Sequence, residues 1–148
     1  MRTLALLASI ALMPIAALAQ VTVSSPWVRA TVPGQMATGA FMTLHSSEDA
    51  KLIEARSPVA GVVQIHEMKM EGGTMTMAAI PSLPLRAGQD VALKPGSFHV
   101  MLMDLKKPIR EGDDVPITLI VETAKHARKA VEVHARAKSA ATPSDNEH

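Results

Sequence analysis

Short stretches of alternating apolar and polar residues, separated by proline, glycine or charged turns, recur along the chain from Val21 onward. Alternation with a period of two predicts half-buried strands, and strands at short, regular intervals are typical of an antiparallel β-sandwich or barrel. We expect strands at 21–32, 39–44, 51–57, 62–70, 74–80, 91–94, 98–105, 115–123 and 128–137. Segment 81–88 contains two prolines and is expected to be a connection, and Trp27, the only Trp, is expected to be a core anchor. The pattern therefore predicts an all-β fold in a single domain, residues 20–137.

One turn is specific enough to predict a register. The strands expected at 62–70 and 74–80 flank Gly72 and Gly73, and a Gly-Gly pair between two strands is typical of a two-residue β-hairpin turn. Such a turn gives three cross-strand pairs: Met70 with Met75, Met68 with Met77, and His66 with Ala79. Because successive side chains of a strand point to opposite faces, His66 and these Met residues share one face. His66 and Met77 are then diagonal neighbours, roughly 7–8 Å apart at the backbone.

The strand expected at 98–105 carries a second group of candidate ligands. His99, Met101 and Met103 alternate with an apolar set made of Phe98, Val100 and Leu102. The apolar set is the better candidate for the core, which leaves the His-Met set free to meet the hairpin. Strand pairing alone thus leaves eight candidate ligands: His66, Met68, Met70, Met75, Met77, His99, Met101 and Met103.

Core packing and a soft-metal site both explain this pattern, and the composition makes the metal site an equal alternative. A Met stripe of period two is also what an apolar core produces. However, the chain has ten Met and no Cys, and six of those Met and two of the six His fall within residues 66–103. Thioether sulfur and imidazole nitrogen suit a soft ion such as Cu(I) better than Zn, Mg or Ca. The other His residues, at 45, 126 and 134, are expected at the surface, and His148 belongs to the C-terminal tail.

The two ends of the chain resemble segments outside the folded domain. Arg2, the apolar run 4–18 and the small-x-small sequence at 17–19 predict a signal peptide, residues 1–19, cleaved after Ala19. We therefore expect an exported, periplasmic protein without a transmembrane span. Residues 138–148 are small, polar and charged, and are expected to be disordered. Acidic and basic residues nearly balance in the mature chain, and the lack of a basic, aromatic-rich face argues against nucleic-acid binding.

The spacing His66-x10-Met77-x21-His99-x-Met101 resembles the signature of the PCuAC family of periplasmic copper(I) chaperones. Further segments that resemble the family lie at 27–30, 39–44, 57–58, 66–68, 93–96 and 112–113, so the similarity spans about residues 26–133. The resemblance implies a cupredoxin-like Greek-key β-barrel that binds Cu(I). It implies that the metal ligands are His66, Met77, His99 and Met101, and that the other four Met residues shield the ion or catch it during transfer.

The same resemblance implies a function and its partners. The family is associated with assembly of the CuA centre of cytochrome c oxidase, so we expect a monomeric carrier that delivers copper. Its acceptor would be the CuA-bearing oxidase subunit or a thiol-containing copper assembly protein. A general periplasmic copper storage or tolerance protein, and a metal-free exported interaction module, stay open as alternatives.

Catalysis is not expected of this chain. A blue-copper centre requires a Cys thiolate, which the sequence lacks. A copper site built on an N-terminal His requires His at the mature start, where Gln20 is expected. No Ser-His-Asp arrangement or paired-carboxylate motif stands out either. We therefore predict that the protein is not an enzyme.

Overall fold

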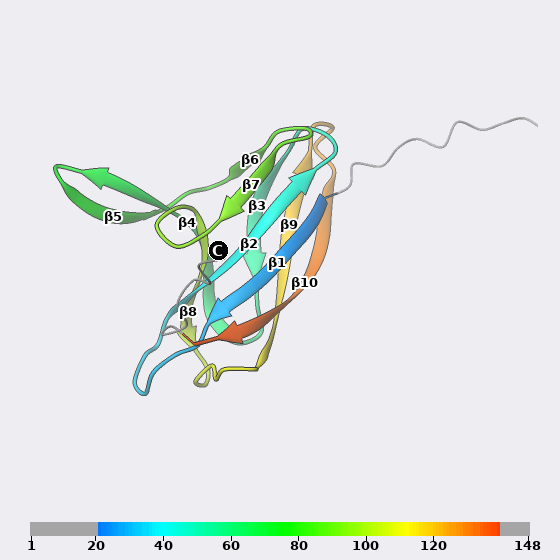
Figure 1. The fold of residues 1–148 in the computed structure, drawn as a ribbon. Coiled ribbons are helices and arrows are strands. Elements are labelled where there is room, and N and C mark those ends of the chain that lie inside the picture. The colour runs from blue at the N-terminus through cyan, green and yellow to red at the C-terminus, as the bar shows by residue number, and fades with distance from the viewer. Residues whose placement is uncertain (1–20, 140–148) are drawn as a thin grey trace, which may run out of the picture.

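Ten β-strands make up the secondary structure of residues 21–139, the part of the chain that the computed structural model describes. Figure 1 shows them as one continuous sheet, without a helix in these residues. The strands are β1 (Val21–Arg29), β2 (Thr38–Ser46), β3 (Ala50–Arg56), β4 (Ala60–Glu71), β5 (Thr74–Ala79), β6 (Leu83–Leu85), β7 (Asp90–Leu93), β8 (His99–Leu105), β9 (Asp114–Thr123) and β10 (Arg128–Lys138). The predicted all-β class is confirmed.

The strands follow the order β5-β4-β8-β2-β1-β10-β9-β3-β6, and β7 pairs with β2 beside β8. β1 and β10 run parallel, whereas the other pairs are antiparallel. The sheet folds over on itself, so that β1 and β2 lie across from β3 and β9 in Figure 1. Buried aliphatic side chains from both halves form one core between them, including Leu44, Leu52, Val100, Leu102, Ile117 and Leu119. This is the sandwich-like arrangement that the alternating pattern predicts.

The hairpin of β4 and β5 has the predicted register. Met70 pairs with Met75, Met68 with Met77, and His66 with Ala79. Gly72 and Gly73 have φ angles of 55° and 80°, which is the type I′ turn geometry that glycine adopts without a steric penalty. In Figure 1 the end of this hairpin projects away from the folded body.

Two expectations about local structure were wrong. Segment 81–88 contains a strand, β6, whose Leu83 and Leu85 are buried while Pro84 between them is exposed. Proline is tolerated there because β6 is the last strand in the order and needs a partner on one side only. Trp27, which we expected as a core anchor, is only half-buried and packs on Phe41 instead.

The ends of the chain stay as predictions. The signal peptide 1–19 lies outside the described residues, as does all but the first part of the tail 138–148. β10 runs to Lys138, one residue past the predicted boundary of the domain. Within residues 21–139 no helix is long and apolar enough to cross a membrane.

Candidate metal centre

Pairing between β4 and β8 brings the two His-Met strands together. His66 lies directly opposite His99, and Gln64 lies opposite Met101. Directly opposed residues of an antiparallel pair project to the same face, and the two imidazole ring centroids are 5.6 Å apart. The expectation that the later strand meets the hairpin is therefore confirmed, and the meeting point is a His-His pair.

The two faces of β8 divide as predicted. Val100 and Leu102 are fully buried in the core. His99 is also nearly buried, at 5% exposure, but on the other face, while Met101 and Met103 are partly exposed. Phe98, the third member of the predicted apolar set, lies just before β8 and is only partly buried against the core. Because Val100 and Leu102 fill the core, the His-Met set is left to line the surface beside the hairpin.

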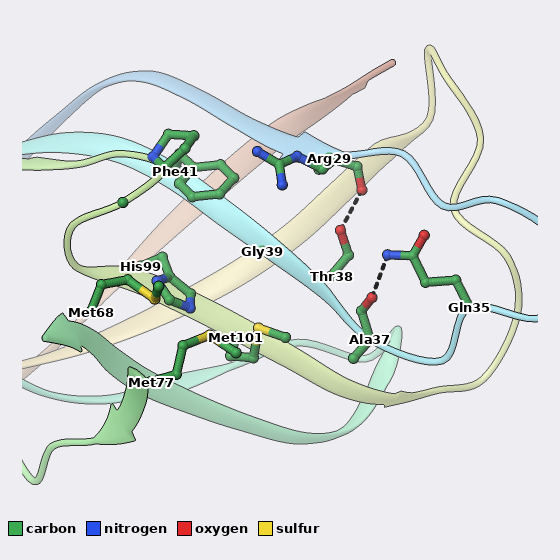
Figure 2. A pocket seen from close by; sticks show the side chains of 12 residues that line it. Arg29, Gln35, Ala37, Thr38, Gly39, Phe41, Met68, Met77, His99 and Met101 are labelled. Atoms are coloured by element: carbon green, nitrogen blue, oxygen red, sulfur yellow. Dashed lines mark hydrogen bonds between the residues drawn. The ribbon is translucent and has the colours of Figure 1, made fainter. Parts of the chain in front are cut away.

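A pocket of about 280 Å³ lies on this His-Met face. Its lining residues are Arg29, Gln35, Ala37, Thr38, Gly39, Phe41, Met68, Met77, Pro95, Gly96, His99 and Met101. Figure 2 shows Met68 beside the His99 imidazole and Met77 and Met101 below it, with Phe41 and Arg29 on the opposite side. The pocket thus contains three residues of the predicted ligand set, and His66 adjoins it through His99.

The other predicted candidates divide into two groups. Met68 lines the pocket although the family motif omits it; strand pairing had kept it among the eight candidates. Met70 and Met75 lie further out on the hairpin and do not line the pocket. Met103 lies on the same face of β8 but opposite Val62, beyond the pocket.

Each imidazole has one nitrogen that is free to bind a ligand. Nδ1 of His99 lies 3.3 Å from the carbonyl oxygen of Ser97, which can only accept a hydrogen bond, so Nδ1 carries the proton and Nε2 keeps its lone pair. Nε2 of His66 lies 2.9 Å from Oε1 of Gln64 and donates to it for the same reason. Nδ1 of His66 is then the acceptor, and it is buried with no hydrogen-bond partner in the described residues. A buried imidazole nitrogen without a partner is costly unless it binds something.

Both imidazoles are held in the neutral form that metals bind. Burial lowers the pKa of His66 below its ordinary value, and repulsion from His99 lowers that pKa further. Burial also lowers the pKa of His99; the carbonyl of Ser97 opposes this, and the positive charge of Arg29 reinforces it. The position of the two rings therefore favours their neutral form over the protonated one.

An aromatic and cationic wall supports His99, and our reasoning from the residue pattern missed it. The Phe41 ring lies 6.2 Å from the His99 ring and 4.6 Å from the Trp27 ring, measured between centroids. The Arg29 guanidinium carbon lies 5.5 Å from the Phe41 centroid, a cation–π distance. Segments 27–30 and 39–44 had signalled these residues only through the family resemblance. Their position places an aromatic ring against His99 and a positive charge behind that ring.

Hard-metal ligands are not grouped in the described part of the chain. Among residues 21–139, no three His, Asp or Glu side chains come together to hold an ion. The remaining described His residues lie at the surface as expected. Each faces a carboxylate: His45 with Asp90, His126 with Glu122 and His134 with Asp114. The donors available at the pocket are thus two neutral imidazoles and several thioethers, a set suited to a soft ion.

Comparison with known proteins gives a family and a fold. Residues 21–134 match the model of the LpqE-like family, whose description is "Putative lipoprotein LpqE-like". A putative lipoprotein of Leifsonia xyli subsp. xyli, Lxx21020, is 35% identical over 100 residues, which are 67% of this chain and 60% of that protein. An uncharacterized protein of Rickettsia prowazekii, RP573, is 31% identical over 66% of this chain and 57% of its own length. The chain therefore spans less than two thirds of each of these relatives.

Two solved structures are also similar. The solution structure of CuI-DR1885 from Deinococcus radiodurans is 34% identical, with a TM-score of 0.63, over 82% of this chain and 81% of that one. The copper-bound PCuAC domain from PmoF2 is 22% identical, with a TM-score of 0.60, over 80% of this chain and 93% of that one, and shows the fold. The chain therefore belongs to the LpqE-like family, and its predicted resemblance to the PCuAC-type family is confirmed.

Proposed function

We propose that the protein is a periplasmic carrier of copper(I) that delivers the ion for assembly of the CuA site of cytochrome c oxidase. The proposed ligands are His66, Met77, His99 and Met101. The signal peptide would export the chain, and the acceptor would be the CuA-bearing subunit or a thiol-containing assembly protein. The copper ion is the cargo of this protein.

The pairing of His66 with His99 is the observation that carries the proposal. Two neutral imidazoles, one with a buried nitrogen that has no partner among the described residues, lie beside the thioethers of Met77 and Met101. All four donors are uncharged, so binding one Cu(I) would add a single positive charge to the site. Neutral donors of this kind favour Cu(I) over harder ions.

The relatives support the same ion. The PmoF2 structure is that of a copper-bound domain, and the DR1885 structure is that of the Cu(I) form of DR1885. DR1885 is the more informative of the two because it is 34% identical to this chain over most of both sequences.

The binding step can be tested by anaerobic titration with Cu(I) against a competing chelator. The wild-type chain should bind one ion tightly, and the double variant His66→Ala/Met101→Leu should lose this affinity. His134→Ala is the matched His control, since His134 is exposed beside Asp114. Met103→Leu is the matched Met control, since it lies on the same strand and face as Met101 but outside the pocket. Unchanged affinity in the double variant would refute the ligand assignment.

The delivery step needs a separate experiment. The Cu(I)-loaded chain is mixed with an apo CuA domain, and metal transfer is followed by NMR on both proteins. Movement of copper to the CuA domain is the expected result. If the copper stays with this chain, general copper storage or tolerance becomes the better description of the function.

A further inference from the structure

The outer part of the hairpin is a free two-stranded ribbon with two different faces. β4 pairs with β8 as far as His66, and the amide of Met68 still donates to the carbonyl of Ser97 at 3.3 Å. In the described structure, residues 69–71 therefore have β5 as their only neighbouring strand. One face carries charged and polar side chains, including Glu67 and Lys69, whose carboxylate and ammonium groups are 3.6 Å apart. The opposite face carries only His66, Ala79 and four Met side chains. A soft, uncharged surface is thereby held out in solvent.

Core packing does not explain the Met residues on this ribbon. Met70, Met75 and Met77 are 65%, 44% and 52% exposed. They make up half of the large apolar side chains that the described structure leaves exposed; the others are Val32, Met36 and Val62. Met has no special preference for exposed strand positions, where β-branched and aromatic residues are enriched.

The hydrogen-bond pattern brings the two Met residues of each pair close together. The amide of Ile80 donates to the carbonyl of Ile65 at 2.9 Å, so Ile65 and Ile80 form a hydrogen-bonded cross-strand pair. Hydrogen-bonded and non-hydrogen-bonded pairs alternate along an antiparallel ladder. Met68/Met77 and Met70/Met75 are therefore both non-hydrogen-bonded pairs, whose Cα atoms lie closer together. Their Cα atoms are then about 4.5 Å apart, and two flexible thioether chains can converge on one ion.

We propose that Met70 and Met75 form a second, weaker and solvent-exposed site for Cu(I), which exchanges its ion with the pocket through Met68 and Met77. The two Met pairs are two residues apart on each strand, which is about 7 Å. Met68 and Met77 line the pocket, so the ladder leads from solvent at the hairpin tip to His99. This inference deepens the proposed function, since it supplies the route by which the ion enters and leaves.

The exchange is chemically simple. Copper stays in the +1 state throughout, and each step forms one copper–sulfur bond at the receiving thioether while it breaks one at the donor. A thioether carries no proton, so none is released or taken up. No oxidant, reductant or other reactant is required.

The test uses the mature chain labelled at the Met methyl groups and titrated with Ag(I), a diamagnetic substitute for Cu(I). In the NMR spectrum the first equivalent should shift the Met77 and Met101 methyls. Further Ag(I) should shift the Met70 and Met75 methyls together. Met36 is 57% exposed but outside this face, and it reports adventitious binding to any exposed thioether. The proposal is overturned if Met70 and Met75 shift no more than Met36 does.

Single variants decide whether the two residues act as one site. Met70→Leu should abolish the late shift of Met75, and Met75→Leu should abolish that of Met70, whereas Met36→Leu should change neither. A Met75 shift that survives in Met70→Leu would contradict a shared site. Leu preserves an apolar side chain of similar volume at these exposed positions, so the fold should persist.

The route is tested separately from the site. The Met70→Leu/Met75→Leu variant should keep the tight affinity for Cu(I) but take the ion up from a chelator more slowly than Met36→Leu does. Equal rates would refute the exchange route. Failure of the proposed function has a different signature, because the first equivalent would then leave Met77 and Met101 unmoved.

Discussion

Gly39 lies where a side chain would collide with the wall of the pocket. It is in β2, opposite Met101 of β8, and both residues line the pocket. A Cβ atom at position 39 would lie 2.8 Å from Cζ of Phe41 and 3.3 Å from its Cε2. The Phe41 ring is buried, at 4% exposure, and it is packed against Trp27. Gly39→Ala should therefore displace a ring that has little room to move.

The expected cost combines two opposing effects. Overpacking of a buried ring typically costs about 1–3 kcal/mol. The backbone of Gly39 is outside the left-handed region, so alanine is allowed there and should return about 0.4–1 kcal/mol by restricting the unfolded chain. The net loss should be about 1–2 kcal/mol in the free energy of unfolding, which corresponds to roughly 4–8 °C in the melting temperature.

Copper binding should weaken in the same variant. The Phe41 ring lies 6.2 Å from the His99 ring, so a ring displaced by the new methyl group pushes on the imidazole. The measurement is a pair of experiments on each variant: urea unfolding of the metal-free chain, and Cu(I) competition with a chelator.

A double-mutant cycle isolates the collision from other effects. Phe41→Leu removes the ring atoms that the new methyl group would meet. Gly39→Ala/Phe41→Leu should then be more stable than the sum of the two single effects predicts, by about 1 kcal/mol or more. Additive effects, or a Gly39→Ala chain as stable as the wild type, would refute the reasoning.

The other predictions concern protonation, ligand binding and the core. Because burial lowers the pKa of His66 and His99, the unfolded chain binds more protons below about pH 6.5, so the free energy of unfolding should fall as the pH drops through this range. Urea unfolding at several pH values checks this, and a His66→Gln/His99→Gln chain should lose the dependence. Burial is the main cause of the lowered pKa of His99, and the positive charge of Arg29 adds to it, so Arg29→Met should raise this pKa in an NMR titration and Arg29→Lys should not. Cu(I) at a hundredfold excess over its dissociation constant should stabilise the chain by about 2.7 kcal/mol in calorimetry, reversibly with a chelator; an unchanged melting temperature would favour a metal-free module. Leu119→Ala should cost about 2–5 kcal/mol in urea unfolding, because Leu119 is fully buried, yet leave Cu(I) affinity unchanged.

Local rules predicted the hairpin correctly. Gly72 and Gly73 define a two-residue turn, and a turn of that length leaves only one register for the strands on either side. The face of β8 followed from alternation alone, because Val100 and Leu102 had to be buried somewhere. Both results depend on residues close in sequence.

Contacts between distant segments could not be predicted in the same way. Nothing local determines that His66 faces His99 and not a residue two positions away, because the register of β4 on β8 depends on how the whole sheet folds over. The half-buried position of Trp27 also depends on contacts between strands that are distant in sequence. A large aromatic residue usually anchors a core, but here β1 presents it to Phe41 beside the pocket. Family resemblance supplied the ligand spacing, whereas the contact of Phe41 and Arg29 with the His99 side of the pocket could be recognised only in the structure.

Strand β1 gives the molecule a functional polarity. β1 begins at Val21, the first described residue, and ends at Arg29, which lines the pocket. The two ends of this strand are therefore roughly 25 Å apart. The start of the described chain therefore lies at the end of β1 that is remote from the pocket. The Met-lined hairpin also projects from the pocket end. A partner can therefore reach the pocket and the hairpin together, at the end of β1 that the start of the described chain does not occupy.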